Sequence, residues 1–257
     1  MKVETQRRID RTAGTIICRI FSIYYKIFKK ESPRNETQNI LIILLSEMGA
    51  LVLGYPMLQR LKKKFPAACL HIMLFEKNRE VVELLGVIPP ENIMTINDST
   101  MPVFVKSALG ALAHMRKLKI DTVIDCELFS RVSSIFSFLS GAAIRVGFHP
   151  HTQEGLYRGN FMNRPVLYNP YQHIARQFIT LVEAIDSTTA PKAKYMITEE
   201  KLEIPAIKFE PAEIEDAKKR LLDQAPGIKD RKIVLIYPGG GLLPIRAWPL
   251  DYYCGLA

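Results

Sequence analysis

The part of the sequence best suited to chemistry is the glycine-rich run Pro238–Arg246, which reads PGGGLLPIR and follows an apolar stretch. It combines three consecutive glycines with a cation, at Gly239, Gly240, Gly241 and Arg246. Glycines let a backbone approach a ligand closely, free amides at the start of a following helix can hold phosphate, and arginine binds phosphate in a bidentate manner. The run therefore favours a nucleotide diphosphate ligand, although three glycines can also form a plain flexible turn.

Two further loops could take part in binding, because each follows an apolar run that is typical of a strand. They are Ser46–Ala50 (SEMGA) and Asp125–Arg131 (DCELFSR). Ligands of open α/β sheets bind at the carboxyl ends of the strands, where both loops would lie. The sequence contains no Walker A, Gly-x-Gly-x-x-Gly, His-Glu-x-x-His or Gly-x-Ser-x-Gly motif, which argues against an ATPase, a standard dinucleotide dehydrogenase, a zinc protease and a serine hydrolase. The four cysteines are far apart and form no cluster with histidine, so we expect neither a metal site nor a disulfide framework.

The elements that would position these loops alternate between strand and helix. Ile40–Leu45 is a continuous apolar run without alternation, which is typical of a strand buried on both faces of a parallel sheet. We predict further strands near 69–75, 92–96, 122–125 and 143–148, a helix after Gly49, and other helices near 79–85, 103–118, 132–139 and 172–185. This pattern predicts an α/β fold with an open, doubly wound parallel sheet, interrupted by a long loop over 149–170.

The C-terminal part continues the same alternation after an extended connector. A charged helix is expected near 213–222, a buried strand at Lys232–Tyr237, and a helix from Trp248. One strand and one unfinished helix cannot bury a core, so we interpret them as the incomplete start of a second α/β domain. The alternative is that they complete the first sheet. The predicted organisation is a leader at 1–34, a Rossmann-like domain at 35–190, a connector at 191–229 and the start of a second domain at 230–257.

The leader carries most of the net charge. Residues 1–34 contain nine basic and three acidic side chains, a formal charge of +6, whereas the other 223 residues supply only +3 of the total of +9. Apolar residues recur at helical spacing, at Ile9, Ala13, Ile16, Ile17, Ile20, Phe21, Tyr24, Ile27 and Phe28. Arg19 and Lys26 interrupt this run, which is too short to span a bilayer. A basic amphipathic helix of this kind can lie on an anionic membrane surface, or it can dock on the protein's own body.

Four parts of the sequence resemble glycosyltransferase family 9, the lipopolysaccharide heptosyltransferase group. They are Ile40–Pro56, Ile120–Arg131 with Leu139–Ala142 and Arg145–Phe148, His173 with Arg176, and Ile233–Pro249. The resemblance implies a GT-B fold, in which one Rossmann-like domain receives the acceptor and a second holds the nucleotide sugar. It also implies inverting transfer of a heptose-like sugar from a donor such as ADP-heptose to a lipopolysaccharide or lipid-linked acceptor, with no cofactor and no essential metal.

The resemblance suggests roles for individual residues, with one departure. The family's expected base is an Asp directly after the Ser-x-x-Gly turn, where this sequence has Ala50. Glu47 on the same turn is a candidate replacement or an ordinary exposed residue, and Asp125 is a second candidate whose more ordinary role is hydrogen bonding at a strand end. The donor phosphates would contact Gly239, Gly240, Gly241 and Arg246. The acceptor cleft would include Ser46, Gly49, Arg131, His173 and Arg176, although the last two could equally form a capping or surface pair.

Our leading hypothesis is therefore a glycosyltransferase of lipopolysaccharide biosynthesis, cytoplasmic and peripheral on the inner face of the inner membrane. With most of the second domain missing, the chain alone would be inactive. A catalytically inert GT-B-like binding protein is the alternative, and a Rossmann oxidoreductase is a weaker one. We expect no nucleic-acid partner, because the leader explains most of the charge.

Overall fold

A computed structural model describes residues 3–28, 37–45, 47–148, 157–186, 202–229, 231–239 and 247–256 of the chain. The chain divides into two compact units, Met1–Ile207 and Lys208–Ala257, which we call unit 1 and unit 2.

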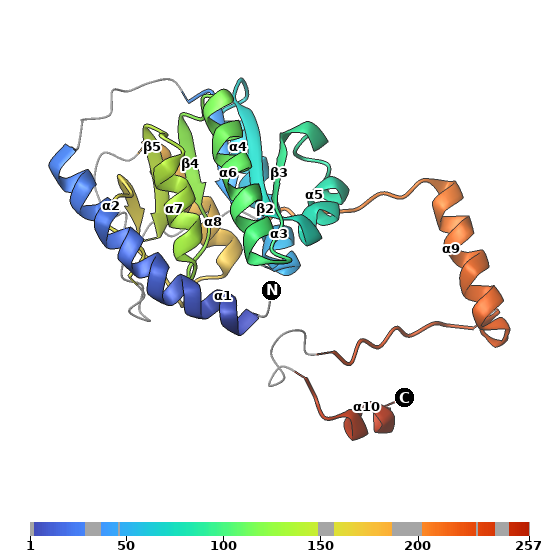
Figure 1. Ribbon diagram of the computed structural model, residues 1–257. Coiled ribbons are helices and arrows are strands. Elements are labelled where there is room, and N and C mark those ends of the chain that lie inside the picture. The colour runs from blue at the N-terminus through green and yellow to red at the C-terminus, as the bar shows by residue number, and fades with distance from the viewer. Residues whose placement is uncertain are drawn as a thin grey trace. The chain divides into compact units, whose positions relative to one another are not determined.

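Unit 1 is built on a parallel sheet of six strands in the order β3-β2-β1-β4-β5-β6 (Figure 1). The strands are β1 Asn39–Ile43, β2 Cys69–Phe75, β3 Ile93–Ile96, β4 Thr122–Asp125, β5 Ile144–Phe148 and β6 Arg164–Val166. The chain moves outward from β1 to β3 and then returns to the other side of β1 to form β4. This confirms the predicted doubly wound α/β fold. The short strand β6 was not predicted, because it has three residues, contains Pro165, and lies in a segment that reads as loop.

Helices cover both faces of the sheet because its strands are apolar on both faces. Ile40 and Ile42 of β1 pack in one cluster with residues of α3, α4, α5 and α8, whereas Leu41 and Ile43 pack on the opposite face with residues of α6 and α7. These helices are α3 Met48–Leu53, α4 Tyr55–Lys64, α5 Arg79–Leu85, α6 Met101–Lys117, α7 Arg131–Leu139 and α8 Ile174–Glu183. The 3₁₀ turns η2 Glu76–Asn78, η3 Pro90–Asn92 and η4 Ala184–Asp186 complete the described connections.

The leader forms α1 Val3–Ile9, a π-helical turn η1 Asp10–Gly14, and α2 Thr15–Phe28. It lies along α7 (Figure 1), and the Phe21 ring stacks on Phe138 with 4.6 Å between centroids. Cys18 is fully buried in this contact. A Cβ on Gly14 would lie 3.0 Å from the Arg131 Cβ, so glycine permits the close approach. The docked arrangement, one of the two alternatives for the leader, is therefore observed for its inner face.

Unit 2 contains α9 Pro211–Gln224, the 3₁₀ turn η5 Pro226–Ile228, and α10 Leu250–Leu256. The strand predicted at Lys232–Tyr237 is wrong: the described residues 231–239 form no strand, and Leu235 is 93% exposed. A strand is stabilised by hydrogen bonds and side-chain contacts with a neighbouring strand, and an apolar sequence alone does not supply them. Among the helices described in the two units, none is both long and apolar enough to cross a bilayer.

Candidate functional site

The candidate site lies where the order of strands reverses, between the carboxyl ends of β1 and β4. These strands are parallel neighbours, with Ile43 in register with Asp125, and the Cys126 amide donates to the Ile43 carbonyl at 3.0 Å. After this point the chain leaves β1 toward α3 on one face of the sheet and leaves β4 toward α7 on the other. Such a reversal opens a crevice in which ligands of open α/β sheets bind. Two of the three predicted ligand loops therefore meet at one edge.

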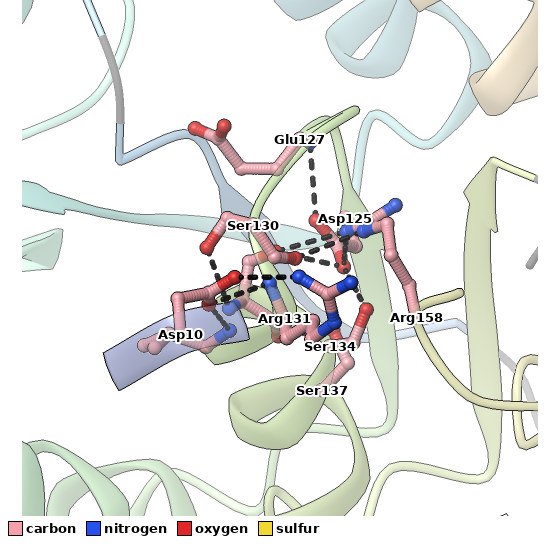
Figure 2. Close-up of polar contacts among 10 residues, drawn as sticks. Asp10, Asp125, Glu127, Ser130, Arg131, Ser134, Ser137 and Arg158 are labelled. Atoms are coloured by element: carbon pink, nitrogen blue, oxygen red, sulfur yellow. Dashed lines mark hydrogen bonds and ion pairs between the residues drawn. The ribbon is translucent and has the colours of Figure 1, made fainter. Parts of the chain in front are cut away.

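A buried polar network holds the loop after β4 (Figure 2). Asp125, at the end of β4, is fully buried, and its Oδ1 accepts a hydrogen bond from the Glu127 amide at 3.1 Å. Its Oδ2 accepts hydrogen bonds from the hydroxyls of Ser133 and Ser134, at 3.1 and 3.2 Å. Arg158 completes the network with an ion pair of 2.5 Å to the same oxygen. Burial raises the pKa of the Asp125 carboxyl, while Arg158, the Glu127 amide and the two hydroxyls act in the opposite direction.

Arg158 joins this carboxylate to the start of α7. Its Nε donates to the Ser130 carbonyl at 2.9 Å, and its Nη2 also donates to the Ser133 hydroxyl at 2.9 Å. Because Asp125 and Arg158 are both enclosed, their geometry fits hydrogen bonding at the strand end, which was the more ordinary role expected for Asp125. Sequence reasoning did not identify Arg158, which lies in the segment that reads as a long loop.

The N-terminus of α7 is occupied by a carboxylate from the leader. Asp10 Oδ1 accepts hydrogen bonds from the amides of Arg131 and Val132, at 2.9 and 3.0 Å. Asp10 Oδ2 pairs with the Arg131 guanidinium at 3.1 Å. Free amides and the helix dipole stabilise an anion at this position, and the arginine adds a full positive charge. Arg131 was predicted to line the acceptor cleft. It lies at this edge of the sheet, where its guanidinium and its amide hold the Asp10 carboxylate. Asp10 was not predicted as a partner.

The loop after β1 supplies the candidate base. Glu47 is exposed and occupies the N-cap position of α3, and its carbonyl accepts the Ala50 amide at 2.9 Å. Gly49 is exposed, and a Cβ there would meet nothing within 4 Å. Ser46 lies outside the described residues. Of the two candidate bases, Glu47 is exposed at the carboxyl edge of the sheet and Asp125 is fully buried.

His173 and Arg176 lie at the start of α8, which follows β6 and begins at the same carboxyl edge of the sheet. His173 is the N-cap residue of α8, and its Nδ1 accepts a hydrogen bond from the Ala175 amide at 3.3 Å. Arg176 is half-buried in the first turn of the helix. His173 thus has the capping function that was the alternative to an acceptor role. Contact of the pair with an acceptor stays a prediction.

The donor-phosphate residues belong to unit 2. Gly239 is exposed, at the end of the described segment 231–239. Gly240, Gly241 and Arg246 lie outside the described residues. Their contact with a donor stays a prediction.

No protein-family model matches this sequence, and no curated protein matches it. Solved structures do match its fold. A glycosyl transferase family 9 structure from Veillonella parvula covers 89% of this chain with a TM-score of 0.61 and 16% identity. The E. coli ADP-heptose lps heptosyltransferase II covers 85% with a TM-score of 0.58 and 16% identity. This chain spans 60% of the length of each. The resemblance found in the sequence is therefore confirmed at the level of fold: this chain has the α/β fold of glycosyltransferase family 9 structures.

Proposed function

We propose that this protein is an inverting glycosyltransferase that moves a heptose-like sugar from a nucleotide-diphosphate donor to a lipopolysaccharide or lipid-linked acceptor. The observation that carries the proposal is the carboxyl edge of β1 and β4: in a chain with the fold of these transferases, the loop after β1 presents an exposed carboxylate, Glu47, where the order of strands reverses. The donor would resemble ADP-heptose, because the E. coli ADP-heptose lps heptosyltransferase II shares this fold.

The proposed reaction needs a base for the acceptor hydroxyl and groups that stabilise the departing diphosphate. Glu47 takes the proton of an acceptor hydroxyl while the oxygen attacks the anomeric carbon of the donor sugar. The bond to the diphosphate oxygen breaks, and the configuration inverts. Arg246 and the amides of Gly239–Gly241 would stabilise the negative charge on the departing diphosphate. Contact of Arg131 with an anionic group of the acceptor would require Asp10 to leave the N-terminus of α7, because Asp10 pairs with the Arg131 guanidinium and with the amides of Arg131 and Val132.

The test compares ADP release from ADP-heptose, in the presence of a lipopolysaccharide core acceptor, by a full-length wild type and by its Glu47→Gln variant. Loss of a general base lowers kcat by about 10²- to 10⁴-fold, while donor binding remains. Glu91→Gln, at an exposed position in η3, is the matched control and should retain full activity. Full activity of Glu47→Gln would reject Glu47 as the base.

The second candidate function is a catalytically inert binding protein of the same fold. Ala50 favours it, because it removes the carboxylate that the family resemblance leads us to expect. This hypothesis predicts that ADP-heptose binds, as measured by calorimetry, without any ADP release by the wild type. Turnover by the wild type would reject it.

A further inference from the structure

The outer face of α2 carries an apolar surface that the fold does not use. Its members, which we call the outer stripe, are 55% to 67% exposed: Ile16, Ile20, Ile23, Tyr24, Ile27 and Phe28. They recur at steps of three and four residues, so they form one continuous row along the helix. Large apolar side chains gathered in this way indicate an interaction surface rather than scattered surface residues.

The inner face of the same helix is already committed to unit 1. Cys18 is fully buried there, Phe21 stacks on Phe138, and the guanidinium of Arg145 lies 5.1 Å from the centre of the Tyr25 ring. Because these contacts fix the rotation of the helix, the outer stripe points away from the body, except at the Tyr24 ring, which lies edge-on to Phe138 with 6.2 Å between centroids. The apolar residues of the leader thus form one row that is docked on unit 1 and one row that is exposed. Sequence periodicity alone did not separate these two rows.

The charges around the outer stripe indicate what covers it. Arg8, Arg19 and Lys26 are exposed on the leader. Arg19 and Lys26 are seven positions apart on α2, so helical spacing places both along one edge of the stripe, whereas Arg8 lies on α1 before the π-helical turn. The acidic Asp10 instead turns inward to Arg131. A bilayer with anionic headgroups offers both an apolar layer for the stripe and negative charge for its edge.

We propose that α2 lies in the surface of an anionic membrane, with the outer stripe among the acyl chains and Arg8, Arg19 and Lys26 at the headgroups. A second copy of this chain is a poorer partner, because it would bring the same cations and, from the described part of the leader, only Glu4 as an exposed acid. A nucleic acid would match the cations but would leave the isoleucines in water.

Because the inner face of the leader is docked, the leader would also fix how unit 1 is oriented at the membrane. The leader reaches the carboxyl edge of the sheet through Asp10 and lies along α7 as far as Phe138. It therefore holds the β1–β4 crevice at a fixed orientation to the bilayer, unlike a flexible tether. This inference goes beyond the proposed transferase activity and does not depend on it.

The first experiment measures co-sedimentation of the whole protein with vesicles of phosphatidylcholine alone or with 30% phosphatidylglycerol. We expect the wild type to bind the anionic vesicles, and Ile20→Ser/Ile27→Ser to bind them at least about tenfold more weakly. Leu109→Ser, at an apolar side chain of α6 that is similarly exposed, is the matched control and should bind as the wild type does. Failure of the wild type to bind, or undiminished binding by the double variant, would overturn the proposal.

The charge contribution is tested with Arg19→Gln/Lys26→Gln. We expect about tenfold weaker binding to anionic vesicles, with a difference that shrinks at high salt because salt screens exposed charges. Lys62→Gln/Lys63→Gln on α4 removes two other exposed cations and should have little effect. Equal losses in both double variants would reject this edge as the binding surface.

A third measurement reports which surface enters the lipid. The chain has one tryptophan, Trp248, so a Trp248→Phe background allows a single reporter at Ile23→Trp. Its emission should shift to the blue when anionic vesicles are added, whereas Leu109→Trp should not respond. Sedimentation velocity without vesicles completes the test: a wild-type dimer that Ile20→Ser/Ile27→Ser converts to monomer would assign the stripe to a second copy and overturn the proposal.

Discussion

β1 and the apolar stretch Lys232–Tyr237 are similar in composition, but among the residues that the structure describes only β1 has neighbouring strands. Parallel strands β2 and β4 flank β1, and helices cover both of its faces, so residues 40–43 are fully buried. In the described segment 231–239, Val234 and Leu235 are more than 80% exposed. The comparison shows that an apolar run becomes a strand through the partners that pair with it, and that its own composition is insufficient.

The largest expected effect is the difference in unfolding free energy between removing an ion pair in unit 1 and removing one in unit 2. Asp125→Asn leaves the Arg158 charge buried and unpaired, so we expect a loss of about 3–5 kcal/mol in the free energy of unfolding. The matched variant in unit 2 is Asp216→Asn, whose pair with Arg220 is largely exposed and should contribute less than about 0.5 kcal/mol. Urea denaturation followed by far-UV circular dichroism measures both. Equal effects would mean that the network after β4 is not enclosed.

The comparison between the two apolar stretches can be tested directly by removing one side chain from each. Ile42→Ala creates a cavity in a fully buried strand and should cost about 2–4 kcal/mol. Leu235→Ala removes an exposed side chain and should change the free energy of unfolding by less than about 0.5 kcal/mol. If Leu235→Ala lowered the free energy of unfolding by more than about 1–2 kcal/mol in the same urea measurement, this stretch would be packed in solution.

The clearest strand predictions were β1 and β2, because a continuous apolar run without alternation reports burial on two faces. β1 and β2 are found within one residue of their predicted starts. β6 was missed because Pro165 and its three-residue length give no periodic pattern. The incorrect strand at Lys232–Tyr237 has the right composition, but composition does not reveal that none of the described residues pairs with it.

The sequence predicted where the candidate site lies, but it did not predict which residues contact one another there. The loops after β1 and β4 could be located because strand ends determine where ligands bind. Asp10 and Arg131 are 121 positions apart in sequence, and Arg158 reaches back 33 positions to Asp125. Periodicity reports only on neighbours within a few residues, so neither pair had a local signal. Asp10 was recognisable only as an acid within a basic leader.

The contact between Asp10 and α7 should have an intermediate effect. Asp10→Ala removes the carboxylate that bonds two amides and Arg131, and we expect docking of the leader to weaken by about 2 kcal/mol. The reporter is Cys18, because burial raises the pKa of its thiol to about 12 and shields it from reagents. Thiol labelling of Cys18 should become at least about tenfold faster. Glu4→Ala is the control on the same leader, exposed Cys69 is the internal reference, and unchanged Cys18 labelling would contradict the role of Asp10.

The smallest expected effect is the pH dependence of stability that His71 contributes to unit 1. All five histidines precede unit 2, so titration of histidine reports on unit 1 alone. His71 lies on β2 beside Leu41, and neither of its ring nitrogens has a hydrogen-bond partner in the part of the chain that the structure describes. Burial lowers the pKa of His71 from its ordinary value of 6.5, and the charge of His114 lowers it further.

The unfolded chain therefore binds this proton more tightly than the folded chain does. Stability is fully present above pH 6.5 and falls as the pH drops below it, by at most about 1.4 kcal/mol per pH unit, until the folded pKa is reached. His71→Leu should flatten the dependence of the urea midpoint between pH 7 and pH 5. Ile72→Leu changes a buried side chain on the same strand without removing a titratable group, and should keep the wild-type slope. If His71→Leu kept the wild-type slope as well, His71 would not be the buried group that resists protonation, and the enclosed face of β2 would have to admit water.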